Sequence, residues 1–392
     1  MSYHGPLRLA TPRELGFCPD RMSLVDALVR DWTNGPNAPW PAASLAVGRR
    51  GRLLEPICHG RRGPEPDAEP VRPDDLFLIA SLTKPITYLA GMRMVERGLL
   101  GLSEPVVERL PEFAAHGKAS TLVQHLFTHT SGLPDMLPNN RELRRRQAPL
   151  DEFLRHVCED TAPLFPPGAG FQYQSMGTLV AAELAQRASG LDLPEMMRRE
   201  LFTPLGLDST RLGSAGLDER RIVRVKTPAD QEPAWDWNSG YWRRLGAPWG
   251  GMFSTPSEYA ALCHLMVNGG RWEKNQIASP ATVRMMTTNR LDDLPNVPEA
   301  QRRTKAWGLG WQMNHPTGVD CLCDLLGPDA FGHIGATGTI VWCDPRSATY
   351  CVLFTSAPRD EASCTQAIMT KRVSAYKAYH ATAVYSFYLA TC

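Results

Sequence analysis

Ser81-Leu82-Thr83-Lys84 follows a short apolar stretch, Leu76-Phe77-Leu78-Ile79, which is typical of a strand that leads into a helix. A serine and a lysine three positions apart lie on the same face of a first helical turn. Serine becomes a good nucleophile when a nearby base removes its proton, and a lysine can be that base when burial lowers its pKa. The helix N-terminus also favours negative charge on the serine oxygen. The stretch therefore predicts a nucleophile, Ser81, and its base, Lys84.

This pattern alone is weak, because a chain of this length should contain roughly one such match by chance. A second match, Ser374-Ala375-Tyr376-Lys377, is interpreted as accidental. Two further segments support a functional interpretation of the first match, Ser81-Leu82-Thr83-Lys84. Phe171-Gln172-Tyr173-Gln174-Ser175 follows a Pro-Pro-Gly turn and precedes a helical run, 177–188. The segment 331–342, Phe-Gly-His-Ile-Gly-Ala-Thr-Gly-Thr-Ile-Val-Trp, is predicted to be a β-strand whose glycines let a backbone or a substrate approach closely.

In their order and context, these three segments resemble the serine β-lactamase and penicillin-binding protein superfamily, whose motifs are S-x-x-K, a second Ser or Tyr motif and K-T-G. The tyrosine in the second motif resembles the branch of class C β-lactamases, D,D-peptidases and family VIII carboxylesterases, and the pattern is nearest to the last. The resemblance runs from about Ala43 to about Ser356. Further segments that carry it are 126–133 (Leu-Phe-Thr-His-Thr-Ser-Gly-Leu), 165–168 (Phe-Pro-Pro-Gly), 204–207 (Pro-Leu-Gly-Leu), 250–255 (Gly-Gly-Met-Phe-Ser-Thr) and 308–311 (Gly-Leu-Gly-Trp).

The expected fold class is α+β, of the β-lactamase and transpeptidase type. Strand patterns at both ends of the chain and helical patterns between them predict one antiparallel sheet, flanked by helices and built from both ends. We expect residues 1–100 and 300–392 to form this sheet domain and residues 101–299 a mostly helical domain, with the active site in the cleft between them. The predicted strands are 44–47 and 53–58, which form a hairpin, and 308–313, 339–342 and 350–355. The helix after Ser81 should turn Ile86, Leu89, Ala90 and Met94 to the core.

The resemblance implies a mechanism without a metal or an organic cofactor. Ser81 would attack an acyl carbonyl and form an acyl-enzyme, which water then hydrolyses. Lys84 and Tyr173 would share the task of general base, and Tyr173 would return a proton to the leaving group. The backbone amides of Ser81 and Ala336 would form the oxyanion hole. Ser175, His333 and Gly335 would contact the substrate.

Two departures from the family pattern bear on the substrate. The second motif, usually Tyr-x-Asn, reads Tyr173-Gln174-Ser175, and serine lacks the two N–H donors of asparagine. The third motif, Lys-Thr-Gly in β-lactamases, reads His333-Ile334-Gly335, and histidine is only partly charged near neutral pH. Both changes weaken the grip on the amide and carboxylate of a β-lactam. A histidine in this position is also similar to some D,D-peptidases and D-aminopeptidases.

An aromatic stretch between residues 235 and 249 contains Trp242 and Trp249. These rings would line an apolar acyl or alcohol pocket, and ordinary core packing is the alternative. His125 and His129 are four residues apart without the glutamate of a metalloprotease helix, so packing is preferred to a metal site. The ten cysteines are scattered and expected to be free thiols.

The whole chain excludes some partners. With 42 Lys and Arg against 41 Asp and Glu, the charge balance indicates no nucleic-acid partner. Residues 1–16 lack the apolar core of a secretory signal, and no apolar run is long enough to span a membrane, so a cytoplasmic protein is expected. The oligomeric state and the packing of the tyrosine-rich tail, 373–392, are not predicted.

Three functions remain open at the level of sequence. The leading hypothesis is a serine carboxylesterase whose substrate is a small-molecule, short-chain acyl ester. The second is a D,D-peptidase, a D-aminopeptidase or a weak β-lactamase of the same fold. The third is a catalytically silent binding protein, against which the presence of Ser81, Lys84 and Tyr173 argues.

Overall fold

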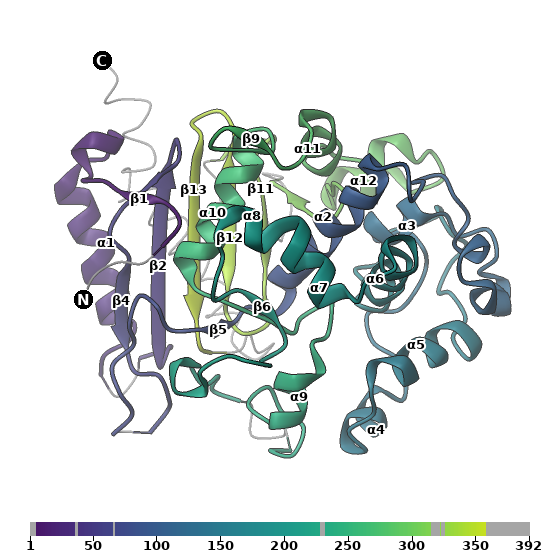
Figure 1. The fold of residues 1–392 in the computed structure, drawn as a ribbon, viewed down its shortest axis with the longest axis horizontal. Helices are drawn as coiled ribbons and strands as arrows, with labels where there is room; N and C mark the ends of the chain where they lie inside the picture. Colours follow the sequence, from purple (N-terminus) through teal and green to yellow (C-terminus); the bar gives the residue numbers. More distant parts are fainter. Residues whose placement is uncertain are drawn as a thin grey trace.

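The structure is a computed structural model, and it describes residues 5–35, 38–65, 67–227, 232–314, 322 and 326–357. Its main sheet has eight strands, and its central pair joins β2 from the N-terminal part of the chain to β13 from the C-terminal part (Figure 1). They pair antiparallel, from Ala43 opposite Thr355 to Arg49 opposite Thr349. In spatial order the strands are β1 (Arg8–Leu9), β3 (Arg52–Leu53), β2 (Ala42–Arg49), β13 (Thr349–Thr355), β12 (Ile340–Asp344), β11 (Phe331–Ile334) and β10 (Gln312–Met313), and β4 (Ile57–Gly60) also pairs with β2.

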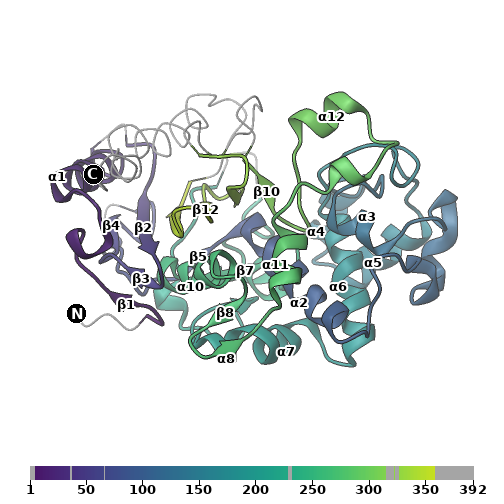
Figure 2. The same cartoon turned by 90° about the horizontal axis from the view of Figure 1, so that it is seen from above.

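Alternation along β13 explains why this sheet is buried on both faces. Tyr350, Val352 and Phe354 belong to the hydrophobic cluster that includes helix α10 (Pro256–Val267). The intervening Cys351 and Leu353 belong to the cluster that includes helix α1 (Pro19–Asp31). Successive side chains of a strand point to opposite faces, so a strand covered on both sides is apolar throughout. Seen from above, α1 and α10 lie on either side of β2 (Figure 2).

The predicted α+β fold with a sheet built from both chain ends is confirmed, and three strand predictions need correction. The segment 331–342 is not one strand but a hairpin of β11 and β12, because Gly338 takes a left-handed conformation (φ 85°) in the turn between them. The predicted strand 308–313 is reduced to β10, and the predicted strand 53–58 is divided into β3 and β4. The sheet is also mixed rather than purely antiparallel, since β1 runs parallel to β3.

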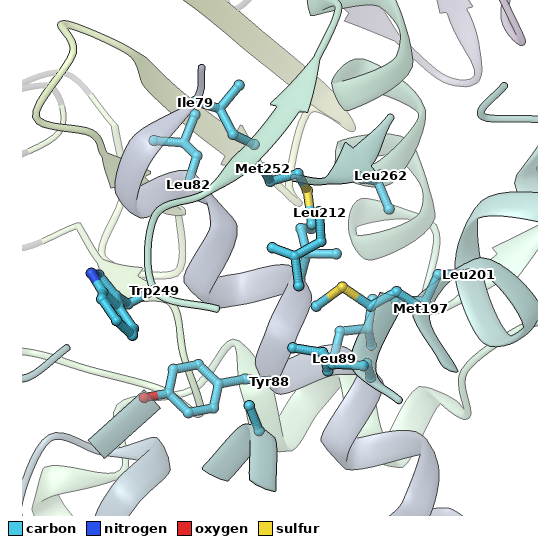
Figure 3. Close-up of a cluster of buried hydrophobic side chains, with 14 of the residues drawn as sticks. Ile79, Leu82, Tyr88, Leu89, Met197, Leu201, Leu212, Trp249, Met252 and Leu262 are labelled. Atoms are coloured by element: carbon cyan, nitrogen blue, oxygen red, sulfur yellow. The ribbon is translucent and has the colours of Figure 1, made fainter. Parts of the chain in front are cut away.

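Helices α2 (Thr83–Glu96) and α6 (Met176–Ser189) pack together at the centre of the helical region. Ile86, Leu89, Ala90 and Met94 of α2 are buried as predicted. Figure 3 shows Leu89 beside side chains from other elements, among them Met197, Leu201 and Leu212. The remaining α-helices are α3 (Val123–Phe127), α4 (Asn140–Arg145), α5 (Leu150–Glu159), α7 (Leu193–Met197), α8 (Thr203–Leu205), α9 (Gly240–Leu245), α11 (Pro280–Met286) and α12 (Glu299–Thr304).

A small second sheet, in the order β5 (Phe77–Leu78), β7 (Met252–Ser254) and β6 (Arg211–Leu212), leads into the helical region. The division of the chain into 1–100 with 300–392 and 101–299 stays a prediction, and α10, from the central part, packs on the main sheet. The other elements are the hairpin β8 (Arg271–Trp272) and β9 (Asn275–Gln276), the 3-10 helices η1 (Arg13–Leu15), η2 (Ala80–Leu82), η3 (Val106–Glu108), η4 (Pro111–Gly117), η6 (Glu219–Arg221) and η7 (Leu291–Asp293), and the π-helical turn η5 (Arg198–Phe202).

Two further predictions concern the chain as a whole. Within the ranges given above, no helix is both long and apolar enough to cross a bilayer. The described cysteines are free thiols: Cys18, Cys58, Cys158, Cys263, Cys343 and Cys351. The tail 373–392 lies outside the described residues.

Candidate active site

Ser81 lies at a sharp turn from strand to helix. β5 ends at Leu78, and Ile79 donates its N–H to the carbonyl of Met252 at 3.0 Å. Ala80 then takes a left-handed conformation, with φ 47°, before the chain enters α2. This backbone conformation costs a residue with a side chain about 1–2 kcal/mol. The Thr83 hydroxyl holds the turn by donating to the Ala80 carbonyl at 2.7 Å. The turn leaves Ser81 partly exposed at the start of the helix.

Lys84 is fully buried directly beneath the serine. Its Nζ donates to Ser81 Oγ at 3.2 Å and to the Trp249 carbonyl at 3.1 Å. Burial disfavours the charged amine and lowers the pKa of Lys84 to about 7, although the negative charge of Asp135 opposes the shift. Near neutral pH a large fraction of this lysine is therefore a neutral amine that can accept the Ser81 proton.

Tyr173 meets Ser81 from the other side, from the loop that leads to α6. A side-chain hydrogen bond joins the two residues, and Lys84 Nζ lies 4.6 Å from the centroid of the Tyr173 ring. Burial raises the pKa of Tyr173 well above its ordinary value, and the charge of Asp135 raises it further. Tyr173 is thus a neutral phenol that can donate a proton. The tyrosinate form that would let it share the role of base is disfavoured.

The turn between β11 and β12 is fastened to the segment that precedes Ser81. Thr337 Oγ1 donates to the Leu78 carbonyl at 2.7 Å, and Thr339 Oγ1 donates to the Ile79 carbonyl at 2.9 Å. Gly335 lies so close that a Cβ there would come 2.7 Å from the Ile79 carbonyl oxygen. The glycine spacing in the sequence therefore does allow a close backbone approach, as predicted.

The two amides predicted for the oxyanion hole are free to bind a ligand. In the described part of the chain, neither the Ser81 N–H nor the Ala336 N–H has an intramolecular acceptor. Ala336 is exposed at the tip of the turn that is fastened beside Ser81. Unpartnered N–H groups beside a nucleophile can stabilise an oxygen that becomes negative during the reaction.

His333 is buried and neutral, which corrects the expectation of a partly charged residue. Its Nδ1 donates to the Ile334 carbonyl at 3.0 Å, which leaves Nε2 as an acceptor without a partner among the described residues. Burial lowers the pKa of His333 to about 3, and the nearby charge of Lys84 contributes. Its ring centroid lies 6.0 Å from that of Tyr173 and 5.6 Å from that of Trp307.

Ser175, which was predicted to contact the substrate, is buried, and its hydroxyl already forms a hydrogen bond within the protein. Ser175 Oγ donates to Asp135 Oδ1 at 2.6 Å, and Ser175 N donates to the same oxygen at 2.9 Å. Because Ser175 immediately precedes α6, Asp135 fixes the start of this helix and the loop that carries Tyr173. A direct contact between Ser175 and substrate stays a prediction.

Trp242 and Trp249 are packed side chains in this structure. Their exposed fractions are 3% and 2%, and the Arg144 guanidinium lies 4.1 Å from the ring centroid of Trp242. Trp249 packs between Trp242 and Phe153, with ring centroids 6.4 and 6.0 Å away. The packing interpretation therefore describes both rings, and the role of Trp249 near Ser81 lies in its carbonyl group.

The two histidines considered for a metal site also pack. His125 Nδ1 accepts the N–H of Leu122 at 3.2 Å, and the His129 ring lies 4.7 Å from Tyr173 and 4.8 Å from Trp307. Among the residues that the structure describes, no group of three His, Cys, Asp or Glu side chains could hold a metal ion.

Asp135 and Trp307 lie at the site and were not predicted from the sequence. Asp135 lies two residues after the family segment 126–133, and Trp307 directly precedes the segment 308–311. Those positions were a usable signal. Neither residue lies near Ser81 or Tyr173 along the chain, however, and only the fold brings them to the site.

Comparison with known proteins agrees with this geometry. The sequence matches the family described as Beta-lactamase over residues 36–370. The chain belongs to this family. Curated proteins similar to this chain include an esterase, penicillin-binding proteins and putative carboxypeptidases.

Two relatives match over part of their length. Esterase EstB of Burkholderia gladioli is 37% identical over 181 residues, which are 42% of this chain and 45% of that protein. Penicillin-binding protein 4* of Bacillus subtilis is 30% identical over 40% of this chain and 35% of its own. The chain thus spans less than half the length of either. A putative D-alanyl-D-alanine carboxypeptidase of Escherichia coli O157:H7 is 22% identical over 89% of this chain and 85% of its own.

Solved structures show the same fold. A penicillin-binding protein homologue from Caulobacter crescentus superimposes with a TM-score of 0.74 at 22% identity, covering 93% of this chain and 98% of its own. EstCE1, a hydrolase with promiscuous acyltransferase activity, gives a TM-score of 0.74 at 19% identity, covering 91% and 98%.

Proposed function

We propose that the chain is a carboxylesterase of the family VIII type that hydrolyses short-chain acyl esters of small molecules through an acyl-enzyme on Ser81. The observation that carries this proposal is the buried, neutral His333 where β-lactamases have the lysine of Lys-Thr-Gly. A neutral imidazole offers no positive charge to the carboxylate of a β-lactam or of a peptide C-terminus. A simple ester has no such carboxylate to bind. The partial likeness to esterase EstB supports the same choice.

In the acylation step, Ser81 Oγ attacks the ester carbonyl carbon while its proton moves to the neutral amine of Lys84. The hydrogen bond of 3.2 Å between Lys84 Nζ and Ser81 Oγ is the path for this proton. The carbonyl oxygen becomes negative, and the N–H groups of Ser81 and Ala336 bind it. Losing one such donor typically costs about 3 kcal/mol of transition-state stabilisation.

The leaving alcohol needs a proton, and Tyr173 supplies it. The phenol is neutral and hydrogen-bonded to Ser81, so it can donate to the alkoxide as the C–O bond breaks. The proton that Lys84 took from Ser81 then returns to Tyr173. In deacylation a water molecule replaces the alcohol and the steps run in reverse: Tyr173 passes its proton to Lys84 as it takes one from the attacking water, and Lys84 returns the proton to Ser81 Oγ as the acyl C–O bond breaks.

The second candidate is amide hydrolysis by a D,D-peptidase, a D-aminopeptidase or a weak β-lactamase. The match to a putative D-alanyl-D-alanine carboxypeptidase over most of both chains favours it. The silent binding protein is the least economical alternative, because Lys84 already contacts Ser81 with a lowered pKa.

The test is hydrolysis of p-nitrophenyl butyrate and of a chromogenic cephalosporin, measured side by side for the wild type and Ser81→Ala. We expect ester turnover that disappears in Ser81→Ala and little cephalosporin turnover. Comparable cephalosporin turnover would favour the second candidate. Ester turnover that survives in Ser81→Ala would overturn Ser81 as nucleophile, and no turnover together with no fluorophosphonate labelling of Ser81 would favour the silent protein.

A further inference from the structure

A cavity of about 690 Å³ lies in the helical region, and none of the predicted catalytic residues lines it. Its walls come from α5, α6, α7, β6 and the end of α9. A volume of this size is in the range that small-molecule sites occupy in proteins. The mechanism proposed for Ser81 does not involve this cavity.

One part of the wall is apolar. Leu212 of β6 lines the cavity, and Figure 3 shows the same side chain near Met197 and Leu89 of the buried core. The cavity therefore reaches the edge of the core rather than forming a shallow surface groove. The other large apolar side chains in the wall are Leu154, Leu179, Leu193, Phe202 and Leu207.

Two of the arginines that line the cavity come from neighbouring elements. Arg211 lies on β6 and Arg244 on α9, and these elements are joined by the hydrogen bond from Ser214 N to the Arg243 carbonyl at 2.8 Å. Among the described residues, neither guanidinium forms an ion pair, and Arg211 makes only a long contact of 3.4 Å with the Ala215 carbonyl. Both side chains are exposed and can meet a ligand.

Most other charges in the wall are already engaged. Arg198 pairs with Glu195, Glu183 pairs with Arg187, and Asp192 accepts the N–H of Glu195 at the start of α7. Two further carboxylates line the cavity, Asp151 at the start of α5 and Asp208 in the loop before β6. Arg211 and Arg244 are therefore the cations of the wall that no described carboxylate engages, and an anionic group would bind beside them rather than beside Asp151 or Asp208.

We infer that this cavity binds a medium-chain monocarboxylate. Its carboxylate lies between Arg211 and Arg244, where bidentate guanidinium–carboxylate hydrogen bonds are favourable. Its alkyl chain lies along the leucines of the wall, where its removal from water stabilises the complex. Carboxylic acids are also the products of the proposed esterase, although its expected substrates carry shorter acyl chains, and only this link to the reaction rests on the proposed function.

The cavity also reaches the segment that holds the catalytic lysine. Gly246 and Pro248 line the cavity, the Pro248 carbonyl accepts the Thr87 hydroxyl at 2.7 Å, and the next carbonyl, of Trp249, accepts Lys84 Nζ at 3.1 Å. A ligand that displaces this segment changes the distance between Lys84 and its acceptor.

The test is calorimetric titration with sodium octanoate, with octan-1-ol and octylamine as probes of the same chain length. It uses the full chain after its active site has been blocked with a fluorophosphonate, or the Ser81→Ala variant if no labelling occurs. We expect octanoate to bind more tightly than either uncharged or cationic probe. Its affinity should fall at least tenfold in Arg211→Gln/Arg244→Gln and in Leu154→Trp, which fills the cavity from α5.

Arg220→Gln is the matched control, because Arg220 is exposed, carries the same charge and lies outside the cavity wall. It should leave octanoate binding unchanged. Binding that is equal in all variants, or that is found only with an unblocked active site, would overturn the inference, as would preference for octan-1-ol or octylamine. The measurement needs no turnover, so a failed esterase assay leaves it intact. The arginine variant, at exposed positions, remains informative if Leu154→Trp does not fold.

Discussion

At the scale of single residues, the site depends on how the protein sets the charge of its side chains. Lys84 has no solvent contact, and burial disfavours its charged form, so its amine loses its proton easily. Tyr173 and His333 are held neutral by the same burial. Of these three side chains, Lys84 is thus the one that changes its charge near neutral pH.

The pH dependence of ester hydrolysis should report Lys84. The base must be neutral, and its neutral fraction grows as the pH rises through its pKa of about 7. We therefore expect kcat/KM for p-nitrophenyl butyrate to rise through about pH 7 and then level off. A profile that stays flat from pH 5 to 9 would contradict Lys84 as the base. Lys84→Met should reduce kcat at least about 10²-fold, the lower range for loss of a general base.

Asp135→Asn should move this inflection to lower pH. The substitution keeps an oxygen that can accept the Ser175 hydrogen bonds and removes the negative charge that favours protonated Lys84. We expect the inflection in kcat/KM to shift down by a measurable fraction of a pH unit at an unchanged Tm. An inflection that shifts upward, or that does not move, would contradict this effect of the Asp135 charge on Lys84.

At the scale of elements, the hairpin of β11 and β12 is the part that sequence reasoning described least well. Its alternating apolar residues fit one strand as well as two, and only the bonds of Thr337 and Thr339 to the Leu78 and Ile79 carbonyls show where the turn must be. The motif residues at the junction with α2 were found more easily, because an S-x-x-K spacing is local. Partners far apart along the chain, such as Asp135 and Ser175, leave no local pattern.

Gly335→Ala should test whether this hairpin holds the oxyanion donor in place. A Cβ at Gly335 would lie 2.7 Å from the Ile79 carbonyl oxygen, so the turn must move away from the start of α2. We expect kcat/KM for the ester to fall about 10²-fold or more, as for loss of one oxyanion donor. Gly101→Ala, where the nearest atom would be 3.4 Å away, is the control and should keep full activity. Equal activity of both variants would show that the Ala336 N–H does not take part in the reaction.

At the scale of the whole molecule, the two ends of the chain complete one sheet. β2 and β13 are about 300 positions apart along the chain. Their antiparallel pairing, from Ala43 opposite Thr355 to Arg49 opposite Thr349, joins the N-terminal and C-terminal parts of the sheet. The sequence predicted this closure because strand patterns at both ends need partners to bury their apolar faces. It did not predict how α10, from the middle of the chain, covers one face.

Leu353→Ala should destabilise the part of the sheet where β13 pairs with β2. Leu353 is fully buried against the α1 face of the sheet, and loss of a buried leucine side chain typically costs about 2–5 kcal/mol. We expect a corresponding fall in the free energy of unfolding from urea denaturation, whereas Leu164→Ala, at a position 62% exposed, should stay close to the wild type. Similar values for the two variants would mean that β13 contributes little to cooperative folding.

The burial of Lys84 has a consequence for the energetics of the whole chain. The unfolded chain keeps this amine protonated up to about pH 10.5, whereas the folded protein releases the proton above about pH 7. Between these values the unfolded state binds more protons, so the stability should rise with pH, by about 1.4 kcal/mol for each unit of the pKa difference. Below pH 7 the full penalty is present.

Lys84→Met should therefore unfold at a higher urea concentration than the wild type at pH 7, and the difference should shrink towards pH 10. A variant less stable than the wild type at pH 7 would contradict this linkage. The lysine that makes Ser81 reactive thus lowers the free energy of unfolding, and the interactions of the surrounding fold must outweigh this loss.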